Sequence, residues 1–170
     1  MRYFIDTEFN ETGETIVLIS IGIVDQYGRT YYAESSEFVA SECQPWVQEN
    51  VISKLGLAKD RKSRNDIRAE IENFFHGDGD IEIWGYYADY DWVVFCWLWG
   101  AMIDLPRGFP KYCMDLQQWW KMLGKPDIKP PDPVDEHNAL ADAKWNQGLW
   151  TALARFERSI SVKNVYDGID

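Results

Sequence analysis

The sequence predicts an α/β domain with a mixed central sheet of about five strands, the first three antiparallel, and helices flanking the sheet. Three strand-like segments open the chain, and helix-like and strand-like segments then alternate. Of the 170 residues, 46% are hydrophobic, so the chain is long and apolar enough for one sizeable core. No repeat or linker divides it. We therefore predict one domain over residues 1–158 and a loose polar tail over residues 159–170.

The first three strands are expected to form an antiparallel meander. Their β-branched and aromatic residues cover residues 2–9, 15–25 and 30–35. The short segments between them contain Gly13 and Gly28, as turns between neighbouring strands commonly do.

The rest of the chain is read as helices that alternate with two short strands. Helices are expected over residues 42–55, from Ser63 or Asn65 to about Phe75, over residues 89–99 and 115–123, and from Asn138 onward, with strands over residues 81–86 and 111–114. Asp115 is placed to cap the fourth helix. Residues 124–136 contain four prolines, which predicts an extended loop before the last helix.

The charge balance limits the kinds of partner. A net charge of −11 disfavours binding to long duplex DNA, which needs a broad basic surface. It is compatible with a short single strand held by its end, since some of the carboxylates can serve to hold metal ions. Residues 54–68 are the one clearly basic segment, and Arg61 and Arg64 within it are candidates to bind backbone phosphates. A solvated helix start explains these charges equally well.

Several features predict a reduced, cytoplasmic setting and no membrane. The most apolar stretch, residues 92–103, is shorter than the ~20 residues of a spanning helix, and no signal peptide opens the chain. The three cysteines, Cys43, Cys96 and Cys113, suit neither a disulfide framework nor a zinc cluster.

Two acidic residues near the N-terminus form the first candidate site. Asp6 and Glu8 are two positions apart on an expected strand, so their side chains share a face. Paired carboxylate oxygens suit Mg²⁺ or Mn²⁺. The alternative is a solvated strand end, but the apolar neighbours predict a buried strand, where unpartnered carboxylates are rare.

A second acidic position lies where the fourth strand gives way to a helix, a common place for ligand sites. Asp91 falls inside the first helical turn and precedes an apolar run, so it is the better candidate to point inward. Its rival, Asp89, is explained as a helix cap.

The third candidate stretch is His137 to Asp142, at the start of the last helix. Residues five apart do not share a helix face, which suggests two roles. Asp142 could bind metal from the helix, while His137 on the preceding loop could take a proton from water. A capping histidine and an exposed aspartate are the alternative.

Together these stretches resemble the three motifs of the DEDDh (DnaQ-like) 3′→5′ exonuclease family. The matching residues are Asp6-x-Glu8, Tyr90-Asp91 and His137-x-Ala139-x-x-Asp142. The chain is most similar to the small stand-alone bacterial and phage exoribonucleases, and the resemblance extends to about residue 156. One departure concerns Tyr86-Tyr87, where many relatives carry His-Asn, so substrate contacts there are expected to differ.

The resemblance implies an RNase H-like fold and a two-metal mechanism. Asp6, Glu8, Asp91 and Asp142 would hold two Mg²⁺ or Mn²⁺ ions, and His137 would be the general base. The expected substrates are single-stranded 3′ ends or overhangs, RNA rather than DNA, and the products are nucleoside 5′-monophosphates.

Other interpretations stay open from the sequence. They are a DNA-directed 3′→5′ exonuclease, a hydrolase of small oligonucleotides or dinucleotides, and a non-catalytic nucleic-acid-binding module, which is disfavoured because all five site residues are present. Thr7 and Phe9, which flank Glu8, are candidate substrate contacts. Phe9 could stack on a terminal base, although a place in the core accounts for it better. A homodimer is one possible assembly.

Overall fold

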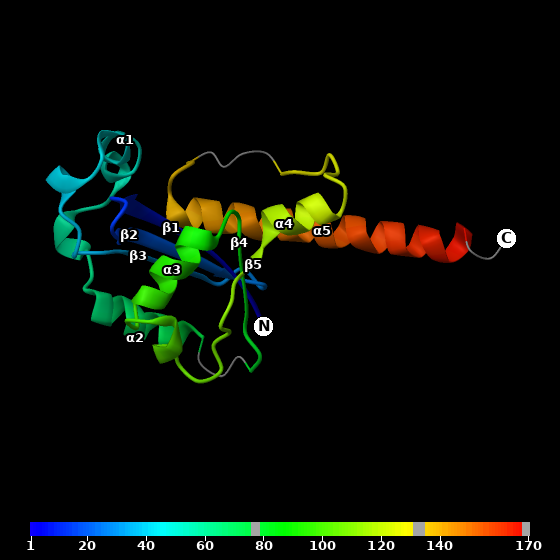
Figure 1. Cartoon of the computed structure of the whole chain (residues 1–170), viewed down its shortest axis with the longest axis horizontal. Coiled ribbons are helices and arrows are strands. Elements are labelled where there is room, and N and C mark those ends of the chain that lie inside the picture. The colour runs from blue at the N-terminus through cyan, green and yellow to red at the C-terminus, as the bar shows by residue number, and fades with distance from the viewer. Residues whose placement is uncertain (76–78, 131–134, 168–170) are drawn as a thin grey trace.

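The fold is a mixed five-stranded sheet between layers of helices, as a computed structural model shows for residues 1–75, 79–130 and 135–167 (Figure 1). The strand order is β3-β2-β1-β4-β5. The strands are β1 (Arg2–Glu11), β2 (Ile16–Asp25), β3 (Thr30–Glu34), β4 (Glu82–Gly85) and β5 (Met114–Asp115). The first three pair antiparallel, whereas β4 is parallel to β1 and β5 to β4. The predicted α/β class and mixed sheet are confirmed.

Helices cover both faces of the sheet (Figure 1). On one face, α2 (Arg64–Phe74) and α3 (Asp89–Trp97) pack on a core that includes Tyr3 and Ile5. On the other, α4 (Leu116–Met122) and α5 (Ala139–Asp167) pack on a second core that includes Phe4. Side chains alternate along a strand, so the even-numbered side chains of β1 face α5.

The helix expected over residues 42–55 is broken into three pieces. They are a 3₁₀ turn at Ala40–Glu42, α1 (Pro45–Asn50) and a second 3₁₀ turn at Ile52–Lys54. Pro45 takes the first helical position because it has no N–H to donate, and it holds Gln44 extended before it. The prediction of a single helix over residues 42–55 is therefore wrong, both in where the helix starts and in its being continuous. Two further 3₁₀ turns span Ala58–Asp60 and Met102–Asp104.

The end of the chain also differs from expectation. Helix α5 continues to Asp167, so the segment expected to be a loose tail from residue 159 is helical that far, and residues 168–170 lie outside the described part. No proline or glycine interrupts the sequence between Gly148 and Gly168, which explains why the helix continues. The proline-rich loop before α5 is confirmed, except residues 131–134, which are not described. Asp115 and Ser63 cap their helices as predicted.

Among the described helices, none combines the length and the hydropathy needed to cross a membrane. The three cysteines are free thiols, and two of them, Cys43 and Cys96, are buried.

Candidate active site

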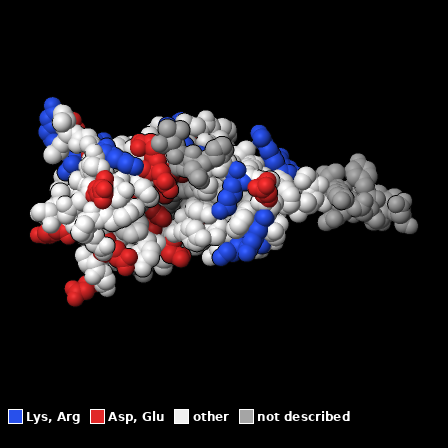
Figure 2. Space-filling view, turned by 90° about the horizontal axis from the view of Figure 1, so that it is seen from above, with Lys and Arg blue, Asp and Glu red and all other residues white. Residues whose placement is uncertain are grey.

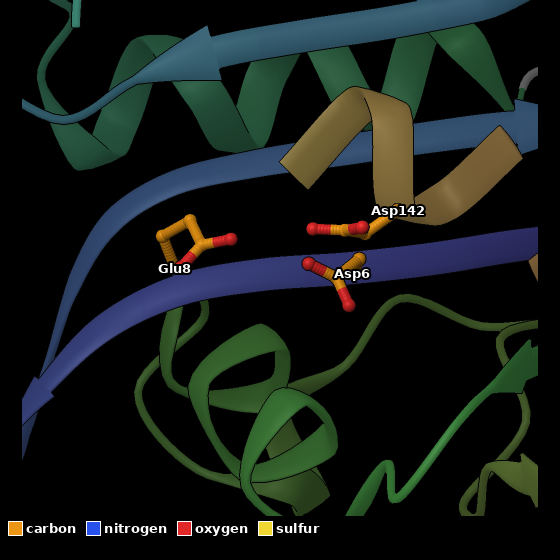
Figure 3. Close-up of side chains that lie close together, drawn as sticks. All are labelled: Asp6, Glu8 and Asp142. Carbon is orange, nitrogen blue, oxygen red and sulfur yellow. The ribbon is translucent and has the colours of Figure 1, made fainter. Parts of the chain in front are cut away.

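Three carboxylates from distant parts of the chain converge on the α5 face of the sheet. Asp6 and Glu8 extend from β1, and Asp142 extends from the first turn of α5 (Figure 3). Each offers an oxygen, and these oxygens all lie within 4.8 Å of one another. This is the separation at which one cation could be bound by all three, so these residues could hold a metal ion.

The approach of α5 depends on a glycine in the strand beside Asp6. Gly22 of β2 is the cross-strand partner of Asp6. A Cβ at this position would lie 2.2 Å from the backbone oxygen of Ala139, so only glycine lets the first turn of α5 come this close. The side chain of Asn146 then fixes α5 to β1, since its Nδ2 donates to the backbone oxygen of Ile5 at 2.9 Å.

Asp91 lies near the three carboxylates, but it belongs to α3, which packs on the other face of the sheet. Its Oδ1 accepts hydrogen bonds from the backbone N–H of Thr7 at 2.8 Å and from the Thr7 hydroxyl at 2.6 Å. Asp91 is not within the group of mutually close oxygens. Its charge nevertheless raises the pKa of both Asp6 and Glu8, which places it at the edge of the same site.

The carboxylates destabilise one another's ionised forms. Burial, followed by the charges of its neighbours, raises the pKa of Asp6 well above its usual value. Burial and the charges of Asp142 and Asp91 raise the pKa of Glu8 to about 8, although Lys54 opposes the shift. Burial also raises the pKa of Asp91 and of Asp142 to about 6 each, against the hydrogen bonds that they accept. Such a group lacks positive charge, which bound cations would supply.

His137 stands at the mouth of this site. It has a left-handed backbone, with φ of 62°, and its N–H donates to Oδ2 of Asp142 at 3.0 Å. Its ring packs edge-on against Trp46 of α1, with centroids 4.9 Å apart. A pocket of about 220 Å³ opens here, lined by Asp6, Tyr86, Glu136, His137, Asp142, Trp145 and Asn146. His137 thus lines the same pocket as Asp6 and Asp142, and its role as a base for water stays a prediction.

The candidate substrate contacts next to Glu8 have partners within the protein. Thr7 is buried, and its hydroxyl binds Asp91. Phe9 is half-buried, and its ring stacks on that of Tyr90 at 5.7 Å. A contact between Thr7 or Phe9 and substrate stays a prediction.

The candidate arginines of the basic segment lie in ion pairs. Arg61 Nε is 3.4 Å from a carboxylate oxygen of Glu34, and Arg64 Nε is 3.8 Å from one of Glu37. The nearby carboxylate partly neutralises each guanidinium, which weakens its attraction for a phosphate. Their role in substrate binding also stays a prediction.

Two residues near the site were not singled out from the sequence. One is Trp46, which is 53% exposed and contacts His137. Lys54 donates from Nζ to the backbone oxygen of Glu136, the residue before His137. Lys54 belongs to the basic segment, but nothing local in the sequence indicated that it reaches this loop.

Comparison with known proteins finds relatives that match most of the chain. The model of the 3′-5′ exoribonuclease Rv2179c-like domain matches residues 1–154. The 3′-5′ exoribonuclease Rv2179c of Mycobacterium tuberculosis is 45% identical over 148 residues, which cover 85% of this chain and 88% of the relative.

Solved structures share the fold at much lower identity. Exonuclease I of E. coli, in complex with a dT13 oligonucleotide, superposes with a TM-score of 0.63 at 10% identity. The match covers 97% of this chain and 43% of exonuclease I, so this chain spans less than half of that protein's length. The catalytic unit of Neurospora crassa Pan2 superposes with a TM-score of 0.53 at 14% identity, over 99% of this chain and 29% of that structure. The five-stranded fold is that of RNase H-like exonucleases, and the chain belongs to the Rv2179c-like family of 3′-5′ exoribonuclease domains.

Proposed function

We propose that this chain removes nucleoside 5′-monophosphates one at a time from single-stranded RNA 3′ ends, with two divalent metal ions. The observation that carries the proposal is the convergence of three half-buried carboxylates, whose oxygens lie within 4.8 Å of one another. The family match supports RNA as the substrate and the 3′ end as the starting point.

The donor set fits hard divalent cations. The oxygens of Asp6, Glu8 and Asp142 suit Mg²⁺ or Mn²⁺, and Asp91 adds a fourth carboxylate at the edge of the site. Among the described residues, no hydrogen bond reaches the carboxylates of Asp6 or Glu8. When bound, such ions stabilise negative charge on the attacking and leaving oxygens of a displacement at phosphorus.

The protein's own groups orient the reaction. His137 is the candidate base, because a neutral imidazole can accept the proton that an attacking water loses. The hydrogen bond from its N–H to Asp142 ties the position of this residue to that of a metal-binding carboxylate. The pocket beside it is bounded by Tyr86 and Trp145, which limits the space open to water and substrate.

Assembly and location belong to the same proposal. A homodimer and a cytoplasmic location remain predictions from the sequence. Sedimentation of the purified chain over a range of concentrations would test the first, and fractionation of cells that produce it would test the second.

The decisive experiment follows a 5′-labelled single-stranded RNA of about 20 nucleotides with Mg²⁺ or Mn²⁺. A ladder that shortens from the 3′ end is expected, and Asp6→Asn protein serves as the control for contaminating nucleases. Matched DNA, a duplex with a 3′ overhang and a dinucleotide complete the comparison. Faster cleavage of DNA would favour a deoxyribonuclease, and cleavage of the dinucleotide alone would favour a small-substrate hydrolase. No cleavage of any substrate would overturn the proposal.

A further inference from the structure

Positive charge is distributed unequally around the acidic pocket. On the side of the basic segment, Arg61, Lys62 and Arg64 are all engaged in ion pairs with glutamates. On the other side, three lysines of α4 and the loop that follows it are exposed, and none forms an ion pair with a described residue. They are Lys121, Lys125 and Lys129, which we name the lysine ridge.

The lysine ridge is joined to the pocket through aromatic rings. Lys129 Nζ donates to the hydroxyl of Tyr86 at 3.0 Å, and Tyr86 lines the pocket together with Asp6. The same ammonium lies 4.4 Å from the centroid of the Trp120 ring. Lys129 therefore contacts a residue, Tyr86, that lines the acidic pocket.

The loop that carries the ridge is fixed to α4 by two hydrogen bonds. The indole N–H of Trp120 donates to the backbone oxygen of Pro126 at 2.9 Å. The backbone N–H of Lys125 donates to the backbone oxygen of Trp120 at 3.0 Å. These two hydrogen bonds fix the start of the loop, which carries Lys125 and Lys129, against α4.

The surface view shows where these charges lie. In Figure 2, acidic side chains gather around a hollow, one group of Lys and Arg side chains lies between it and the projecting end of the molecule, and others lie toward the opposite end. An acidic protein of net charge −11 repels a polyanion unless cations are concentrated along the path of the strand.

We propose that the lysine ridge binds backbone phosphates of the RNA on the 5′ side of the bond that is cut. The proposal rests on the proposed function, because it takes the 3′ end to lie in the acidic pocket. The strand must then leave the pocket, and the ridge offers cations that form no ion pair with any residue that the structure describes. Within the basic segment, Arg61, Lys62 and Arg64 are paired with glutamates, so we assign the backbone-binding surface to the ridge.

The test compares two double variants that each remove two positive charges. One is Lys125→Gln/Lys129→Gln on the ridge. The matched control is Lys59→Gln/Arg107→Gln, which changes two exposed cations that form no ion pair with a described residue. Both are made in the Asp6→Asn background, so that RNA is bound but not cut. Binding of a fluorescent RNA of about 12 nucleotides and of a dinucleotide is measured by anisotropy.

The expected result is a loss that depends on substrate length and on salt. Each phosphate contact contributes about 0.7 to the salt slope of single-strand binding, so two lost contacts lower the slope by about 1.4. Between about 50 and 200 mM salt, the Kd of the parent for the long RNA then rises roughly sevenfold more than the Kd of the ridge variant. The dinucleotide and the control variant should show no such difference.

Failure of this inference is distinguishable from failure of the proposed function. If the ridge variant keeps the salt slope of the parent, or if the control variant loses as much, the lysine ridge is not the binding surface. This would hold whether or not the wild-type protein shortens RNA. Cleavage by the wild-type protein is measured in a separate experiment, and its outcome bears on the proposed function alone.

Discussion

Two aspartates on neighbouring strands differ in their hydrogen-bond partners and in the direction of their pKa shifts. Asp25, at the end of β2, has a fully buried side chain, and its oxygens accept hydrogen bonds from the N–H of Tyr27 at 2.8 Å, the N–H of Arg29 at 2.9 Å and Nε of Arg29 at 2.5 Å. Burial acts to raise its pKa, but the hydrogen bonds and charge of Arg29 and the N–H of Tyr27 outweigh it and hold the pKa below its usual value.

Asp6 on β1 is half-buried, and no described residue donates a hydrogen bond to its carboxylate. Its neighbours are Glu8, Asp91 and Asp142, and their charges add to burial in raising its pKa. The hairpin that contains Asp25 supplies hydrogen-bond donors to its carboxylate. No described residue supplies a donor to the carboxylate of Asp6. The difference separates a structural carboxylate from carboxylates that are arranged for a cation.

The largest expected effect comes from Asp6→Asn. The change replaces a carboxylate that binds metal with a neutral amide, so the rate of cleavage should fall by at least ~10³-fold. The fold should survive, because the change also removes repulsion between carboxylates. Initial rates on labelled RNA and thermal melting without metal check the two statements. Activity within about tenfold of wild type would break the assignment of Asp6 to metal binding.

Asp25→Asn is the matched counterpart of that change. It weakens hydrogen bonds to a charged group, so the free energy of unfolding should fall by roughly 1.5–3 kcal/mol. The rate constant for RNA cleavage by the folded protein should remain that of wild type. If Asp25→Asn abolished cleavage while the fold stayed intact, the distinction between the two aspartates would be wrong.

His137→Ala tests whether the site contains a base as well as a metal-binding group. Loss of a general base should lower the rate by ~10²–10⁴-fold. The affinity for metal should change less, since the residue contacts Asp142 through its backbone N–H, which alanine keeps. The pH–rate profile is the informative measurement. Superimposable profiles for wild type and variant would exclude the proposed role.

Gly22→Ala should disturb the site without changing any of its charges. The new Cβ would meet the backbone oxygen of Ala139, so the first turn of α5 must move and carry Asp142 away from Asp6. A misplacement of about 1 Å can cost on the order of 10²-fold in rate. Gly56→Ala is the matched control, because its Cβ would meet only the flexible end of Glu34, at 3.4 Å. Equal rates in the two variants, per folded molecule, would contradict this role for Gly22.

The parts of the site that follow from local pattern were predictable. Alternation along β1 placed Asp6 and Glu8 on one face, and the position of Asp142 at the start of a helix was readable from its flanking residues. Contacts between distant segments were not. The pairing of Arg61 with Glu34 joins residues 27 positions apart, and its acid could not be identified from spacing.

The same distinction explains the errors in the fold. Pro45 lies inside the helix expected over residues 42–55, and α1 begins only at this proline, because proline is tolerated in the first turn of a helix but not in its interior. Trp46, the next residue, lies exposed beside His137. Hydrophobic spacing indicates a helix, but it does not show which residues outside the helix will cover it.

The smallest expected effect is on the pH dependence of stability. The two kinds of carboxylate should contribute to it with opposite signs. The pKa of Glu8 is raised from its usual 4.5 to about 8 in the folded protein, so the folded state binds the proton more tightly than the unfolded state. Without metal, this residue's contribution is fully favourable below pH 4.5 and is lost as the pH rises toward about 8. The lowered pKa of Asp25 acts the other way, because its contribution is present above pH 3.8 and is lost as the pH falls through the folded pKa.

Urea unfolding from pH 3 to 9, repeated with Glu8→Gln and Asp25→Asn, separates the two contributions. Glu8→Gln should flatten the decline above pH 4.5 and leave the acid limb unchanged, whereas Asp25→Asn should flatten the acid limb alone. Saturating Mg²⁺ or Mn²⁺ should restore stability in the wild type near pH 8, by about 2.7 kcal/mol at a hundred times the Kd. Glu8→Gln should gain less from the same metal, because it has lost a ligand charge. If metal stabilised both variants equally, Glu8 would belong with Asp25 as a structural carboxylate, and the metal site would have to be built without it.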